Sequence, residues 1–216
     1  MLEKNKVKNF IDYCRNSFNF KEQISYNYES LAVCIIDCVY SLCAKYDTVT
    51  KPVVQRYIEY DNNSKATVSK LIKDIEHIGG PELFAKNVLH NEQLSGHVLK
   101  AAICLKLAKY LKMLHIESID DFRNFEEQEL LEIVIMSVKG IGDAGTNYLF
   151  MLAGDQGRCK PDVHIHHCVR DGYGEDLSNE ECQELFKCAV EDLKADNPEL
   201  TVAKLDGIIW RKYHSQ

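Results

Sequence analysis

The stretch that decides the fold runs from Val138 to Asp171 and reads VKGIGDAGTNYLFMLAGDQGRCKPDVHIHHCVRD. It joins a Gly-Ile-Gly turn at 140–142 to a polar loop at 153–162, which ends in a single aspartate, Asp162. A Gly-x-Gly turn lets the backbone approach a partner closely, and a carboxylate at the start of a helix can serve chemistry on a sugar. Together the two halves predict an enzyme that holds a nucleic-acid phosphate and acts on a nucleotide.

The Gly-Ile-Gly turn is predicted to join two helices. Upstream, the segment EQELLEIVIMSV at 127–138 has apolar residues at helical spacing. Downstream, a helix is expected to begin at Asp143, which suits an N-cap. The free N–H groups of its first turn, about residues 142–145, would bind an anion such as a DNA phosphate. The alternative is an ordinary helical hairpin with glycine at a helix C-cap, since a short motif alone is weak evidence.

The polar loop AGDQGRCKPD at 153–162 is expected to lead into a third helix. Pro161 suits the first turn of a helix, and the following VHIHHCV has helix-compatible apolar positions. Asp162 would then present its carboxylate at the helix start. The alternative is that Asp162 only caps this helix and interacts with its dipole.

In this order and spacing, the two halves resemble the helix-hairpin-helix-GPD superfamily of DNA glycosylases. Residues 138–144 correspond to the hairpin of that family, and Pro161-Asp162-Val163-His164 to its aspartate motif. The resemblance implies an all-α fold of two helical lobes with an interdomain cleft. Residues 31–152 would form the central lobe with the hairpin. Residues 1–30 and 153–216 would form the second lobe, which carries the Gly/Pro-Asp loop.

The resemblance also implies an activity, base-excision repair. Duplex DNA with a modified base would be the partner, and a flipped damaged or mispaired base would be removed by hydrolysis of its N-glycosidic bond. Asp162 would stabilise the charge on the sugar and orient water. Ala144 occupies the position of the family's lyase lysine, and a methyl group is no nucleophile, so the enzyme is expected to be monofunctional. The alternative is a catalytically inactive DNA-binding or interaction protein on the same fold.

The resemblance assigns further roles to single residues. His164 would brace the loop, and the base pocket is placed near Tyr40, Ser41 and Cys43. The DNA contacts are assigned to Lys139, Gly140, Ile141, Gly142, Ala144, Gly145, Thr146 and Lys160.

No cofactor or metal is expected, although a structural monovalent cation at the hairpin stays open. The three cysteines after Asp162 have spacings that do not fit the iron–sulfur cluster of some family members: Cys168, Cys182 and Cys188. The tract His164–Cys168 resembles a metal site, but no second cluster supplies the missing ligands.

Composition bounds the partners and the compartment. The net charge of −7 and pI of about 5.6 disfavour non-specific DNA binding, which depends on lysine and arginine. A basic face on residues 94–114 could compensate, or could be a solvated helix face; its lysines are Lys100, Lys106, Lys109 and Lys112. Neither a transmembrane run nor a signal peptide is evident, so no membrane is expected. Nine cysteines, mostly within helical patterns, favour reduced thiols and a cytoplasmic location, nucleoid-associated in a bacterium.

The chain is predicted to be helical almost throughout, with little support for strands. Trp210 is expected in the core of the last helix. The expected helices are 3–17, 28–45, 51–59, 64–78, 81–88, 95–114, 119–122, 126–138, 143–152, 161–171, 179–194 and 202–212.

Overall fold

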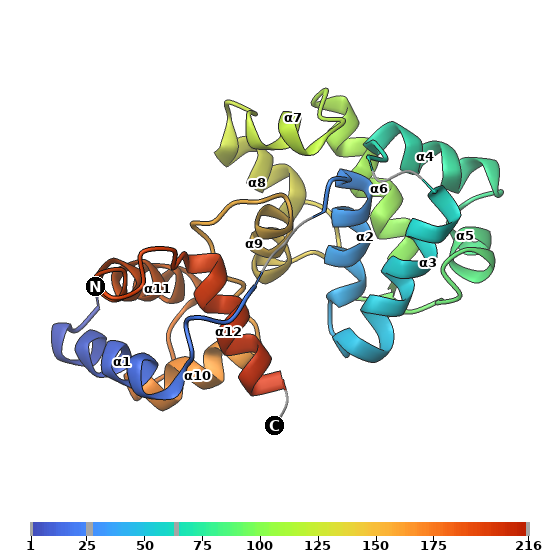
Figure 1. Cartoon of the computed structure of the whole chain (residues 1–216). Helices are drawn as coiled ribbons and strands as arrows, with labels where there is room; N and C mark the ends of the chain where they lie inside the picture. The colour runs from blue at the N-terminus through green and yellow to red at the C-terminus, as the bar shows by residue number, and fades with distance from the viewer. Residues whose placement is uncertain (1, 25–27, 63–64, 215–216) are drawn as a thin grey trace. The chain divides into compact units, whose positions relative to one another are not determined.

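The computed structural model describes residues 2–24, 28–62 and 65–214 (Figure 1). These residues form twelve α-helices, a π-helical turn at Tyr46–Thr50 and one two-stranded antiparallel sheet. The chain divides into two compact units. We call Asn27–Ala153 the central unit, and Met1–Tyr26 with Gly154–Gln216 the terminal unit. No helix of the described part is long and apolar enough to cross a membrane.

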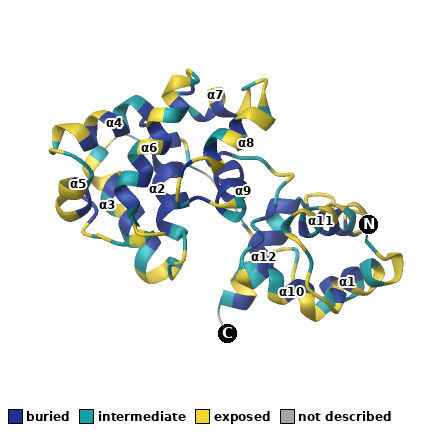
Figure 2. Cartoon of the chain, turned by 180° about the vertical axis from the view of Figure 1, so that it is seen from behind, coloured by how far each residue is buried: buried dark blue, intermediate teal, exposed yellow. Residues whose placement is uncertain are grey.

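The central unit is built around one buried helix, α2 (Leu31–Ser41). Its sequence LAVCIIDCVY is apolar on every side, which is typical of a helix with no face toward water, and all ten of these residues are buried (Figure 2). The Ser30 hydroxyl caps the helix by accepting a hydrogen bond from the Val33 backbone N–H at 3.1 Å. The helices that pack most extensively on α2 are α3 (Lys51–Asp61), α6 (Lys100–Met113) and α9 (Asp143–Leu152). The remaining helices of this unit are α4 (Val68–His77), α5 (Pro81–Asn87), α7 (Ile119–Arg123) and α8 (Gln128–Met136).

The terminal unit brings the two ends of the chain together in one core. It consists of α1 (Lys4–Ser17), α10 (Val163–Tyr173), α11 (Asn179–Leu193) and α12 (Val202–His214). Helix α10 packs against both α1 and α12, and α1 also packs against α11 (Figure 1). The buried residues at their centre include Phe10, Ile165, Phe186 and Ile209. Removing these apolar side chains from water is the main force that holds the unit together.

The all-α prediction is confirmed at the level of mostly helical structure, with one local exception. Residues 95–99, expected in a helix, instead form the strands β1 (Leu94–Ser95) and β2 (Val98–Leu99). The turn residues Gly96 and His97 have φ of 55° and 66°, the left-handed pair that a tight hairpin turn requires. Helix α6 therefore begins only at Lys100.

Candidate functional site

Asp162 is the N-cap residue of α10, and its two carboxylate oxygens are used differently. Oδ1 accepts hydrogen bonds from the backbone N–H of His164 at 2.9 Å and of Ile165 at 3.3 Å. Oδ2 lies 3.8 Å from the Lys160 ammonium. The Asp162 side chain is 19% exposed. One oxygen thus caps the helix, while the other makes only this longer contact with a cation.

The backbone before α10 makes a tight turn that fixes where Asp162 stands. The Asp162 N–H donates to the Lys160 carbonyl at 2.6 Å, so the turn spans three residues with Pro161 at its centre. Proline suits this position because its ring fixes φ and it has no N–H to satisfy. Pro161 is buried, so the turn is held inside the unit.

Side chains of α11 and α12 hold the rest of the loop. The Gln183 side-chain amide accepts from the Cys159 N–H at 3.0 Å and donates to the Cys159 carbonyl at 2.5 Å. Asp206 Oδ1 accepts from the Lys160 N–H at 2.7 Å. Nearer the start of the loop, the Gln156 carbonyl accepts a hydrogen bond from the Ala203 N–H of α12 at 3.2 Å. A loop fixed by this many hydrogen bonds holds its carboxylate in one place, as catalysis and specific binding require.

His164 lies among aromatic rings of α12. Its ring centroid is 6.2 Å from that of Trp210 and 5.7 Å from that of His214, and these last two rings stack at 4.3 Å. Burial lowers the pKa of His164 below its ordinary value, against the opposing effect of the Asp162 charge. Trp210 is only half-buried, so its prediction as a core residue is wrong. The face of α12 that packs into the core is instead formed by neighbouring residues of the same helix.

The Gly-Ile-Gly turn lies in the central unit, between α8 and α9. Gly140 has φ of +104°, and a Cβ placed on it would lie 2.5 Å from Ile103 Cδ1. Gly142 is exposed, and a Cβ there would meet no atom within 4 Å. Gly140 is therefore required by conformation and by space, whereas the space beside Gly142 is open.

Helix α9 begins at Asp143, as predicted, but its N-cap residue differs from the prediction. Gly142 is its N-cap and Asp143 is the first helical residue, so the prediction of Asp143 as the N-cap is wrong. The first intrahelical hydrogen bond runs from the Thr146 N–H to the Gly142 carbonyl at 2.9 Å. Within the described residues, the backbone N–H groups of Asp143, Ala144 and Gly145 have no acceptor. Three unsatisfied donors at the positive end of a helix dipole form a place where an anion can bind.

Few side chains of the predicted DNA contacts reach the surface of this hairpin. Ile141, Gly145 and Thr146 are buried, and the Thr146 hydroxyl donates to the Gly142 carbonyl at 3.1 Å. Lys139 is exposed. Contact with a phosphate would therefore come from backbone N–H groups and the Lys139 ammonium.

The three residues predicted to line a base pocket lie at the end of α2 or just after it. Tyr40 is completely buried, and its hydroxyl donates to the Asn91 carbonyl at 3.2 Å. The Ser41 hydroxyl donates to the Cys38 carbonyl at 2.8 Å. Cys43 is exposed and has φ of 50°. Of the three, Cys43 is exposed, Ser41 is partly buried and Tyr40 belongs to the core.

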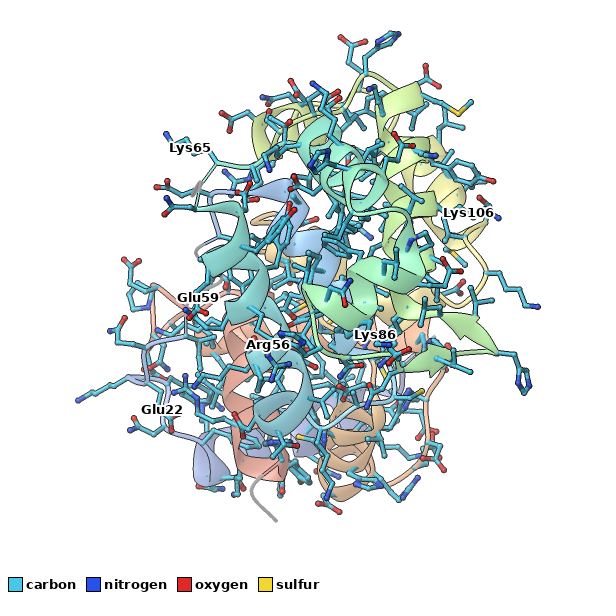
Figure 3. The ribbon with its side chains drawn as sticks, turned by 90° about the vertical axis from the view of Figure 1, so that its right-hand side faces the viewer. Glu22, Arg56, Glu59, Lys65, Lys86 and Lys106 are labelled. Atoms are coloured by element: carbon cyan, nitrogen blue, oxygen red, sulfur yellow. The ribbon has the colours of Figure 1, made fainter. Side chains whose placement is uncertain are left out.

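Lys100 does not belong to a basic face. Its side chain is buried, and the ammonium donates to the carbonyls of Tyr40 at 3.1 Å and Leu42 at 2.7 Å. Burial lowers the pKa of Lys100. Lys106, by contrast, lies on the surface of α6 (Figure 3). The predicted face is thus reduced to exposed lysines that include Lys109, itself paired with Glu76 at 2.9 Å.

A second buried acid, Asp37, lies in the middle of α2. Three tyrosine hydroxyls donate to its carboxylate: Tyr28 at 2.6 Å, Tyr46 at 2.9 Å and Tyr148 at 3.0 Å. Burial and the Asp37 charge both raise the pKa of Tyr28 and of Tyr46. The Tyr148 bond connects α9 to α2 through the Asp37 carboxylate, which is completely buried.

Comparison with known families identifies a match over residues 7–214. The chain belongs to the family described as a domain of unknown function, DUF8548. No curated protein and no solved structure matches it. The chemistry of the DUF8548 chain must therefore be argued from its own residues.

Two of the residues that hold the Asp162 loop in this DUF8548 chain were not predicted from its sequence, Gln183 and Asp206. Asp206 is 3% exposed. A signal for it exists: Val202, Asp206, Ile209 and Tyr213 follow i, i+4, i+7 and i+11, so an acid stands in the apolar row of α12. Gln183 gives no such signal, because a glutamine on an amphipathic helix is common. In the part of the chain that the structure describes, no group of three or more His, Cys, Asp or Glu could hold a metal.

Proposed function

We propose that this protein is a monofunctional DNA glycosylase of base-excision repair, in which Asp162 is the catalytic carboxylate. The observation that carries the proposal is the Asp162 loop. Asp162 is largely buried, one of its oxygens is fixed by two backbone N–H groups, and the turn before it is held by Asp206. The resemblance of the hairpin and the aspartate motif to the helix-hairpin-helix-GPD glycosylases supplies the reaction class.

The proposed step is hydrolysis at C1′ of a flipped nucleotide. The bond between C1′ and the base nitrogen breaks, and the departing base keeps the electron pair. Positive charge develops on the sugar, and the ionised Asp162 stabilises it. A water molecule then bonds to C1′ and gives its proton to Asp162. The products are a free base and an abasic site, and the strand stays intact because Ala144 offers no amine.

The hairpin is proposed to bind the DNA backbone. The unsatisfied N–H groups of Asp143, Ala144 and Gly145 support a phosphate contact at the start of α9. Lys139 is exposed beside them and would add a charge-assisted contact. A contact of this kind orients the DNA without reading its sequence. The choice of base is left to side chains that the motif does not identify.

A screen for base release tests this proposal. Purified protein is incubated with duplexes that each carry one defined lesion or mismatch, and abasic sites are then cleaved with hot alkali. We expect alkali-dependent cleavage of at least one duplex by the wild type, and none by Asp162→Asn. Asparagine caps helices as well as aspartate does, so this variant keeps α10 intact while it removes the charge. Cleavage without alkali would instead show a lyase that uses another amine.

A second candidate is a DNA-binding protein without turnover. Ala144 at the position of the lyase lysine and a net charge of −7 favour it. This candidate predicts a salt-dependent shift of DNA mobility that Asp162→Asn leaves unchanged, with no base released from any duplex. The glycosylase proposal predicts release as well as binding, so the same duplexes distinguish the two.

A further inference from the structure

Asp206 of α12 is an acid that contacts the Asp162 loop, and the proposed mechanism does not use it. It is 3% exposed, and its Oδ1 accepts the Lys160 N–H at 2.7 Å. The residues beside it on α12, Leu205 and Gly207, are also buried. An ionised carboxylate in such a place would lose nearly all of its hydration.

We propose that Asp206 is a positioning residue for Asp162: its buried carboxyl group accepts the Lys160 N–H and, in its neutral form, holds the Lys160–Asp162 turn in its active arrangement. The part of this inference that concerns catalysis rests on the proposed function. The part that concerns protonation does not.

The charges around Asp206 explain why the neutral form is favoured. Burial raises the pKa of Asp206 well above its ordinary value, and the negative charge of Asp162 raises it further. The Lys160 N–H and ammonium act in the opposite direction and are smaller effects. Of the elements packed on α12, only this loop supplies charged groups that act on Asp206; α10 and α11 contribute none in the described part of the chain.

Ionisation of Asp206 would disable the site. It would place a second negative charge near Asp162 in a region with little water, where two like charges are strongly unfavourable. The turn would then open to admit water, which would move Asp162 out of its fixed position and lower the rate of base release. We therefore expect the rate to fall on the alkaline side as Asp206 loses its proton.

Two substitutions separate the two roles of the Asp206 side chain, as an acceptor of the Lys160 N–H and as an ionisable acid. Asp206→Asn keeps an oxygen that can accept the Lys160 N–H, but it cannot ionise. Asp206→Ala removes the acceptor and leaves the Lys160 N–H without a partner. Asp196→Asn, at an exposed position of the same unit, is the matched control for loss of one negative charge.

The experiment is a single-turnover measurement of base release between about pH 6 and pH 10, with DNA affinity measured in parallel. We expect Asp206→Ala to release base about 10- to 100-fold more slowly at neutral pH, with DNA affinity unchanged. We expect Asp206→Asn to match the wild type at neutral pH and to lack its alkaline decline. Wild-type rates in Asp206→Ala would overturn the positioning role, and so would a rate for Asp206→Asn as low as that of Asp206→Ala.

A pH series of unfolding tests the protonation without any substrate. The only tryptophan, Trp210, lies on the same helix as Asp206, so its fluorescence reports unfolding of the terminal unit. The folded-state pKa of Asp206 is raised above the unfolded value, so the folded protein binds the extra proton. The wild type should therefore lose stability relative to Asp206→Asn as pH rises from about 4 through the folded-state pKa. A difference in stability between the wild type and Asp206→Asn that does not change with pH would overturn the protonated state of Asp206. Absence of base release by the wild type would refute only the proposed function.

Discussion

Replacing Gly140 with alanine should lower the free energy of unfolding markedly, whereas replacing Gly142, only two residues away, should change it little. At Gly140, φ is +104°, which costs a residue with a Cβ about 1–3 kcal/mol. The new Cβ would also lie 2.5 Å from Cδ1 of Ile103, a side chain that is 1% exposed, so Ile103 would have to shift within the core. Such overpacking costs a further 1–3 kcal/mol or so. Gly140→Ala should therefore lower the free energy of unfolding by about 2–5 kcal/mol.

Gly142→Ala should be almost neutral for folding. Its φ is −105°, and no atom lies within 4 Å of the position that a Cβ would occupy. The cost is limited to a poorer N-cap, under about 1 kcal/mol. The same open space is where a phosphate would approach the start of α9. We therefore expect Gly142→Ala to weaken DNA binding by about 1 kcal/mol, or roughly fivefold in Kd.

Urea unfolding followed by circular dichroism measures the first effect, and fluorescence anisotropy with a labelled duplex measures the second. A Gly140→Ala protein as stable as the wild type would refute the strain assigned to position 140. Equal loss of stability in Gly142→Ala and Gly140→Ala would refute the difference in backbone conformation and space between the two positions. Unchanged DNA affinity in a folded Gly142→Ala protein would remove the start of α9 from the DNA contact.

Three further variants test the polar interior and its dependence on pH. Lys100→Met keeps the length of the side chain but removes the buried donor to the carbonyls of Tyr40 and Leu42 at the end of α2, so it should lower the free energy of unfolding by about 1–3 kcal/mol. Lys106→Met, on the surface of the same helix, should change this free energy little. Equal values for the two variants in urea unfolding would contradict the assignment. Asp37→Asn should cost about 1–3 kcal/mol by the same measurement, because one amide cannot accept from all three tyrosine hydroxyls, and unchanged stability would mean that these bonds contribute nothing net. The folded-state pKa of His164 is lowered, so the stability that its neutral form contributes is present above about pH 6.5 and is lost as pH falls through the lower folded value. Between about pH 7 and pH 5, the melting temperature should therefore fall more steeply for the wild type than for His164→Gln. Parallel curves of melting temperature against pH would contradict this.

The helices could be predicted from sequence because their apolar spacing and their end signals agree. Helix α9 spans 143–152, as its pattern predicts, and α3 begins at Lys51 with Pro52 in its first turn. The start of α6 could not be placed, because the residues around Gly96 and His97 read as a continuous helical pattern. Only the left-handed turn at these two residues creates the short hairpin. Such a turn depends on local backbone conformation, which apolar spacing does not report.

The candidate site could be predicted in part. The position of Asp162 at a helix start follows from the polar loop before it. Pro161, predicted in the first turn of that helix, instead lies before the N-cap, because α10 begins only at Val163. The groups that hold the loop come from α11 and α12, which are distant in sequence, so no local pattern contains them. The same limit explains Lys100 and Trp210. A lysine on an amphipathic helix reads as solvated and a tryptophan reads as core, and only tertiary packing reverses both assignments.

The most direct test of the central claim is the single-turnover rate of base release by the wild type and by Asp162→Asn on one duplex, with unfolding midpoints measured alongside. The wild type should leave an alkali-labile abasic site, and Asp162→Asn should release base at least about 100-fold more slowly. Because asparagine preserves the cap of α10, the two midpoints should agree closely. Base release at the wild-type rate by a folded Asp162→Asn protein would contradict the account, since Asp162 would then be no more than a helix cap.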